Sequence, residues 1–129
     1  MNTINFKKEI RGDFDSAIVR VTDALKEEGF GVLTRIDFHL KMKEKLGKEM
    51  RPTVILGACN HRLAYDAYMM NSDVTSLLPC NAVVRELGEG RISVEFAKPS
   101  AMMEILGERK LVDLAREADS HLKRVLEKI

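Results

Sequence analysis

The chain has 129 residues, of which 45% are hydrophobic and 32% are charged, and these values indicate one globular domain over residues 1–129. The 21 basic and 20 acidic residues leave a net charge of +1, which excludes the basic excess expected of a protein that binds nucleic acid through its phosphates. No apolar run approaches the roughly 20 residues that a membrane span needs, and the N-terminal segment lacks the apolar core of a signal peptide. We therefore expect a cytoplasmic protein that binds neither membrane nor nucleic acid.

The N-terminal part alternates strands and helices. Residues 4–10 predict a first strand, and apolar residues recur at helical spacing over 13–29. Residues 30–36 predict a second strand. Asp37 is expected to cap a short helix that Gly47 ends.

The central segment, T-V-I-L-G-A-C from Thr53 to Cys59, is apolar throughout after its first residue. A strand of this kind is typical of the interior of a sheet that is covered on both faces. Asn60 is a good cap for a helix that extends to about Met70. The sequence therefore predicts a buried strand that passes directly into a helix.

The C-terminal part contains a hairpin and the longest helix. Two strands, 80–87 and 91–97, flank the turn 88–90. A short helix is expected between Pro99 and Gly107, and an amphipathic helix over 108–128. Alternation in the second strand predicts that one side of the hairpin faces water. The residues expected on that side are Arg91, Ser93 and Glu95.

The expected order is β-α-β-α-β-α-β-β-α-α, in which an antiparallel hairpin follows alternating strands and helices. This order favours an α+β domain over a doubly wound parallel sheet. We expect a single mixed or antiparallel sheet with helices packed on one face. The hairpin would leave an edge that is free to pair with a second copy.

Four segments together resemble the domain-of-unknown-function 302 family. They are G-F-G-V-L-T-R-I-D (Gly29 to Asp37), L-G-A-C-N (Leu56 to Asn60) with Ala64, L-L-P-C-N-A-V-V-R-E (Leu77 to Glu86) and P-S-A-M-M (Pro99 to Met103). The resemblance covers nearly the whole chain. It implies a compact α+β domain that often occurs as a homodimer, and it implies no activity. The chain departs from relatives at His61 and Lys98, where a proline and an acidic residue are frequent, so any role of that acidic residue is in doubt here.

The two cysteines, Cys59 and Cys80, are the first candidates for chemistry. Cys59 precedes a predicted helix, whose positive N-terminal end would lower the pKa of the thiol and favour a reactive thiolate. If the two strand ends meet, the sulfurs become neighbours and could serve in redox chemistry or bind a soft metal ion. The alternative is that both are buried thiols that act as small hydrophobes. Their spacing matches neither a C-x-x-C motif nor a zinc ribbon.

Three polar residues next to the cysteines complete the candidate site. Asn60 and Asn81 follow the two cysteines and could present amides to a ligand, although capping and turn formation explain such residues as well. His61 could join both cysteines as a metal ligand, with Met103 as a soft fourth. Against this, ligands two residues apart across a helix start do not converge naturally.

No catalytic motif is present. The chain has no nucleophile elbow, Walker loop, dinucleotide-binding glycine motif or zinc-protease motif, and no carboxylate pair stands out for acid–base chemistry. Whether the protein is an enzyme therefore stays open. The sequence favours a binding or redox module centred on the two Cys-Asn segments. The alternative is a non-catalytic module whose apolar cleft, lined by Ala58, Val83 and Met102 among others, binds a small ligand or a partner protein.

Overall fold

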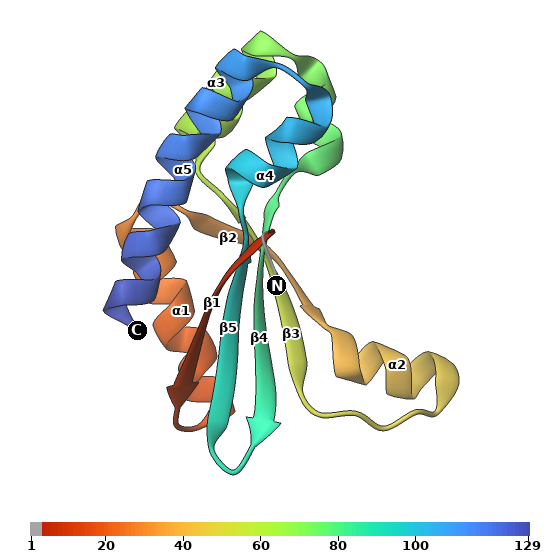
Figure 1. Ribbon diagram of the computed structural model, residues 1–129. Helices are drawn as coiled ribbons and strands as arrows, with labels where there is room; N and C mark the ends of the chain where they lie inside the picture. The colour runs from red at the N-terminus through yellow and green to blue at the C-terminus, as the bar shows by residue number, and fades with distance from the viewer. Residues whose placement is uncertain (1–3) are drawn as a thin grey trace.

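A computed structural model describes residues 4–129 of the protein and contains one five-stranded sheet (Figure 1). The strand order is β1-β5-β4-β3-β2, and every neighbouring pair is antiparallel. The sheet confirms the expected α+β class, in its antiparallel form. The strands are β1 (Asn5–Arg11), β2 (Gly31–Asp37), β3 (Thr53–Cys59), β4 (Cys80–Gly88) and β5 (Arg91–Ala97).

The helices lie where periodicity predicted them. They are α1 (Phe14–Glu27), α2 (Phe38–Leu46), α3 (His61–Met70), α4 (Pro99–Met103) and α5 (Arg109–Lys128). Two short 3-10 helices, η1 (Ser72–Leu77) and η2 (Glu104–Leu106), add to this set, and η1 was not predicted. Among helices of the described residues, none is both long and apolar enough to cross a membrane.

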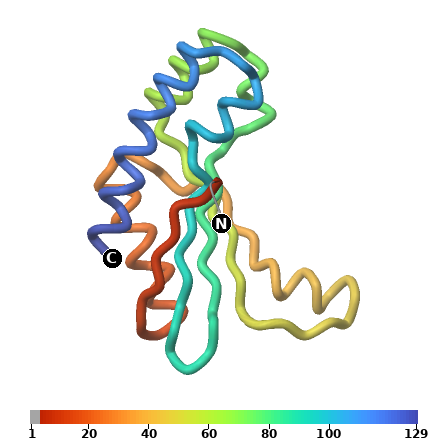
Figure 2. Tube along the Cα trace, viewed as in Figure 1, coloured from red at the N-terminus to blue at the C-terminus, as the bar shows by residue number. Residues whose placement is uncertain are grey.

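The long helices α1 and α5 cover one face of the sheet (Figures 1 and 2). Alternate residues of the central strands point toward them and form the core. The apolar stripe predicted for α5 is buried as expected. Fully buried members of this core include Val54, Leu56, Val84, Val94, Phe96, Leu122 and Val125.

Helix α2 differs from the others because none of its residues is buried. It projects from the end of β2 away from the sheet (Figure 1). Gly47 ends it in a left-handed conformation (φ 67°), as predicted. Asp37, however, makes no capping hydrogen bond. Its carboxylate instead accepts a hydrogen bond from Arg35 (Nη2 to Oδ1, 3.0 Å), which removes it from the helix end.

The helix-free side of the hairpin is less exposed than its alternation predicted. Ser93 is 9% exposed and Glu95 is 4% exposed. The Glu95 carboxylate accepts a hydrogen bond from Ser93 (3.0 Å) and pairs with Arg85 (3.2 Å) and Lys7 (3.9 Å). The long side chains from the neighbouring strands therefore shield this side from water.

The prediction that the hairpin has a free edge is also wrong. Both hairpin strands, β4 and β5, are interior, because β3 pairs with β4 and β1 pairs with β5. The edges of the sheet are β1 and β2.

Candidate functional site

The antiparallel register of β3 and β4 brings the two Cys-Asn segments together. Ala58 pairs with Cys80, so the end of β3 and the start of β4 lie side by side. Both cysteines are free thiols and both are partly buried. The strand ends therefore meet, which was the condition for a common site.

A pocket opens between these strand ends and the helices α3, α4 and α5. The cavity has a volume of ≈ 50 Å³ and lies within ≈ 460 Å³ of space that continues into solvent. Small side chains at facing positions leave this room. Five alanines line it: Ala58, Ala64, Ala67, Ala115 and Ala118.

Three of the residues that line the pocket carry a thiol or a polar side chain: Cys59, Asn60 and Cys80. All other lining residues are apolar, among them Phe30, Leu63 and Met103. No charged side chain contributes to the wall among the described residues. The pocket therefore suits an uncharged ligand, because a charged group would lose its hydration without a partner.

Both thiols are harder to ionise than a free cysteine. Burial raises the pKa of Cys59. Burial also raises the pKa of Cys80 to about 11, and the negative charges of the Cys59 thiolate and Asp119 add to this rise. We expected the helix start to lower the pKa of Cys59, but the pKa shifts in the opposite direction. Desolvation disfavours the thiolate form, so both thiols are protonated at neutral pH.

Asn60 is held in place by its capping role. Its side-chain oxygen accepts a hydrogen bond from the backbone N–H of Leu63 (3.1 Å), which caps α3 as predicted. Gly29, whose φ is +83°, allows this arrangement: a Cβ there would stand 3.1 Å from Nδ2 of Asn60. The amide is therefore fixed at the rim of the pocket rather than free to follow a ligand.

The remaining sequence candidates lie elsewhere. Asn81 and His61 are exposed and do not line the pocket. Val83 and Met102 also lie outside its wall, whereas Ala58 is part of it. Among the residues that the structure describes, no three or more histidine, cysteine, aspartate or glutamate side chains are grouped so that they could hold a metal ion. The expected Cys59–His61–Cys80 ligand set is therefore not assembled.

A buried polar pair beside the pocket was missed from the sequence. Ser100, at the start of α4, donates its backbone N–H (3.0 Å) and its hydroxyl (2.6 Å) to the carboxylate of Asp119 on α5. Each residue is 6% exposed. The available signal was an acidic residue four positions after Ala115 on the apolar stripe of α5. The pair fastens α4 to α5 and so holds one wall of the pocket.

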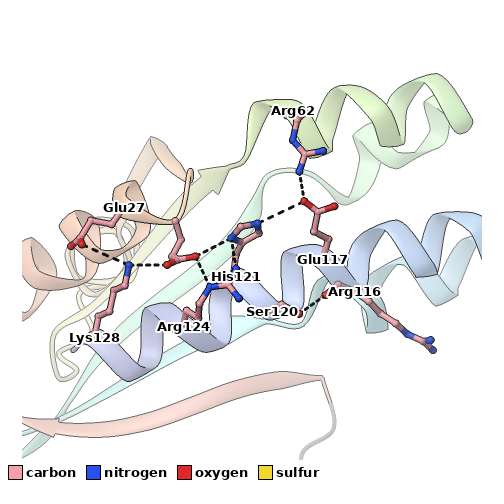
Figure 3. Close-up of polar contacts among 9 residues, drawn as sticks. Glu27, Arg62, Arg116, Glu117, Ser120, His121, Arg124 and Lys128 are labelled. Atoms are coloured by element: carbon pink, nitrogen blue, oxygen red, sulfur yellow. Dashed lines mark hydrogen bonds and ion pairs between the residues drawn. The ribbon is translucent and has the colours of Figure 1, made fainter.

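A network of charged residues joins the end of α1 and the helices α3 and α5 (Figure 3). Glu28, just after α1, accepts hydrogen bonds from Lys128 (2.7 Å) and Arg124 (2.9 Å) on α5 and contacts His121 (2.9 Å). Hydrogen bonds from Lys128, His121 and Arg124 lower the pKa of Glu28 to about 2.

Two further contacts link the network to α3 and to the pocket. Arg62 on α3 pairs with Glu117 on α5. The ring of His121 meets that of Phe30, a lining residue, edge to face with centroids 6.4 Å apart. The network therefore links α3 to α5, two of the helices that form the pocket, and contacts its wall at Phe30.

Comparisons with known proteins agree with this architecture. Residues 6–129 match the family model described as "Domain of unknown function DUF302". The fold is similar to the crystal structure of an uncharacterized conserved protein DUF302 from Bacillus stearothermophilus, with a TM-score of 0.90, 27% sequence identity and 98% of each chain covered. No curated protein matches the chain.

Proposed function

The chain belongs to the DUF302 family of domains of unknown function, and we propose that it is a binding module for a small uncharged ligand that enters the pocket beside Cys59 and Cys80. The observation that carries the proposal is the composition of the pocket wall. Five alanines and several larger apolar side chains surround two protonated thiols and one amide. Such a wall offers apolar contact and few, fixed hydrogen-bonding groups, as small-molecule sites commonly do.

The size of the cavity limits the ligand. A dry engineered cavity of about 150 Å³ holds benzene, and the present cavity has about a third of that volume. It therefore accommodates a short aliphatic group, while the rest of the ligand lies at the open mouth. Asn60 at the rim is the residue placed to contact a polar group there.

Thiol chemistry receives less support than binding. The thiolate is the reactive form of cysteine, and burial raises the pKa of both thiols. Near neutral pH, each thiol would therefore react more slowly than free cysteine. We propose no catalytic residue for this site.

The test compares two probes of the same size that differ in charge. Isobutanol and isobutyrate carry the same isopropyl group. We expect isobutanol to shift the methyl NMR signals of Ala115, Ala118 and Met103 in a saturable way, and isobutyrate to leave them unchanged. An equal response to both probes, or no saturable response to isobutanol, would contradict the proposal.

Filling the pocket provides the matched control. Ala115→Leu places an isobutyl side chain into the cavity and should weaken isobutanol binding at least tenfold. Ser120→Leu adds similar bulk at an exposed position of α5 and should leave binding unchanged. If Ala115→Leu does not fold, Ala64→Leu at the half-buried wall on α3 replaces it. Binding that survives a folded pocket-filling variant would place the ligand elsewhere.

A soft metal ion is a second candidate, favoured by one specific observation. Three sulfur-bearing residues, Cys59, Cys80 and Met103, line the same pocket. Each thiol would release one proton on binding. Titration with Ag(I) should then show thiolate-to-metal absorption at one ion per chain. Replacing both cysteines with alanine should abolish that absorption but preserve isobutanol binding, which separates the two candidates.

A further inference from the structure

The outer edge of β1 is open to a further strand. β1 lies at one margin of the sheet and pairs only with β5 among the described strands (Figure 1). An edge strand presents backbone N–H and C=O groups that can pair with another extended chain. No residue of β1 lines the ligand pocket, so this edge is a separate feature of the molecule.

The register of β1 and β5 identifies the backbone groups that are available. The N–H of Lys98 donates to the carbonyl oxygen of Ile4 (2.6 Å). At the other end of the ladder, the N–H of Gly12 donates to the carbonyl oxygen of Gly90 (2.9 Å). Because hydrogen-bonded pairs alternate with pairs that are not, the even-numbered residues of β1 face β5 and the backbone groups of the odd-numbered residues point outward. The outward-pointing residues are Asn5, Lys7, Glu9 and Arg11.

Two lysines beside this edge have no acidic partner. Nζ of Lys98, which follows β5, lies 5.7 Å from the ring centre of Phe6 in β1. Nζ of Lys123 on α5 lies 5.5 Å from the same ring. Neither lysine forms an ion pair within the described residues, and residues 1–3 contain no acidic side chain. Two ammonium groups therefore gather at one aromatic ring of the edge strand without a counter-charge.

The strand itself adds to this basic surplus. β1 contains three basic residues and one acidic residue. The acidic residue, Glu9, already pairs with Arg91 (3.4 Å). Two copies of β1 side by side would bring their basic residues together, which disfavours pairing of the chain with itself. The same charges attract a strand of opposite sign.

We propose that an extended acidic segment of a partner protein adds to the sheet as a sixth strand along β1. Its backbone pairs with the outward N–H and C=O groups of residues 5–11. Directly opposite side chains on neighbouring strands have Cβ atoms about 5 Å apart. A carboxylate opposite Phe6 therefore comes within reach of Lys98 and Lys123. The backbone ladder supplies affinity, and the two lysines select an acidic segment over a basic one.

Heptapeptides of alternating charged and valine residues test this proposal. The acidic probe is acetyl-E-V-E-V-E-V-E-amide, and the basic probe has lysine in place of each glutamate. Isothermal titration calorimetry should show saturable binding of the acidic probe and an affinity at least tenfold lower for the basic probe. Methylation of every backbone nitrogen of the acidic probe keeps its charge but removes its donors, and should also weaken binding at least tenfold.

A double variant measures the contribution of charge. Lys98→Gln combined with Lys123→Gln should weaken binding of the acidic probe at least tenfold. The matched control, Lys26→Gln combined with Lys110→Gln, removes two exposed lysines of α1 and α5 that lie outside β1. It should leave the affinity within about threefold of the wild-type value.

A proline at Glu9 measures the contribution of the backbone. Proline is tolerated on an edge strand where its nitrogen faces solvent, so Glu9→Pro should fold. Removal of an acidic residue by itself favours an acidic ligand, but the loss of one outward donor should still weaken binding at least threefold. Glu9→Gln, which keeps the donor, should bind at least as tightly as the wild type. If Glu9→Pro does not fold, the methylated probe measures the same contribution.

Four results would overturn the proposed strand addition. They are no saturable binding of the acidic probe, equal binding of the basic or the methylated probe, normal binding by the Lys98 and Lys123 double variant, and slow solvent exchange of the outward β1 amides in the protein alone. The last result would show that a second copy already covers the edge.

Discussion

The two Cys-Asn segments are identical dipeptides at neighbouring strand ends, but their surroundings differ. After Cys59 the chain leaves the sheet and enters α3, so Asn60 turns to cap the helix at the rim of the pocket. After Cys80 the chain continues as β4, where Asn81 pairs with Gly57 and is exposed. Side chains alternate along a strand, so Asn81 points away from the side that Cys80 and Ala82 face. The path of the chain after the cysteine, rather than the dipeptide, decides whether the asparagine joins the site.

The largest expected effect comes from placing a charge on each side of β4. Cys80→Asp puts a carboxylate into an apolar wall close to Asp119, and should lower the free energy of unfolding at pH 7 by about 3 kcal/mol or more. Asn81→Asp changes an exposed residue and should stay within about 0.5 kcal/mol of the wild type. Urea unfolding of the two variants measures the difference. Similar losses in both would show that the two positions share one environment.

The next largest expected effect is a fall in the free energy of unfolding at alkaline pH. An unfolded cysteine thiol ionises near 9, whereas Cys80 in the folded protein stays protonated up to about 11. The unfolded state therefore loses its proton first, and the contribution of Cys80 is complete below pH 9 and is lost as the pH rises to 11. The loss should be about 2 kcal/mol.

Unfolding free energies measured across this pH range should isolate that contribution. Cys80→Ala should lose about 2 kcal/mol less than the wild type between pH 9 and 11. Asn81→Ala should lose stability in parallel with the wild type, since it leaves the thiol in place. Parallel curves for all three proteins would mean that Cys80 is solvated.

The smallest expected effect is the difference in stability between alanine variants of the two asparagines. Asn60→Ala removes the cap of α3 and should cost about 1 kcal/mol. Asn81→Ala should cost less than about 0.5 kcal/mol. Thermal or urea unfolding checks both values, and Asn60→Ser, which can still cap, should recover most of the loss. Equal costs for the two alanine variants would contradict the different roles assigned here.

Much of the fold could be predicted from local sequence patterns. The helical spacing of Leu111, Ala115, Leu122 and Val125 identified the longest helix, and glycines marked the ends of α2 and η2. The Gly88–Gly90 turn identified the β4–β5 hairpin. These signals succeed because capping, turn formation and periodicity depend on residues close in sequence.

The candidate site could be predicted only in part. Cys59, Asn60 and Cys80 line the pocket, but the sequence also nominated Asn81, with His61 as a possible metal ligand, and neither of these lines it. Asp119 stood out as an acidic residue on an apolar stripe, but its partner Ser100 could not be predicted because it is 19 positions away and belongs to a different helix. The burial of Glu95 likewise depends on side chains from neighbouring strands.

The sequence by itself determined the α+β class, the positions of the main strands and helices, and the cap of α3 at Asn60. Only the tertiary structure decided the strand order, the pocket between α3 and α5, and the direction in which the pKa values of Cys59 and Cys80 shift. The physical reason is the distance along the chain over which each kind of interaction acts. Backbone preferences act over a few residues, whereas desolvation and pocket shape arise from side chains that only folding brings together.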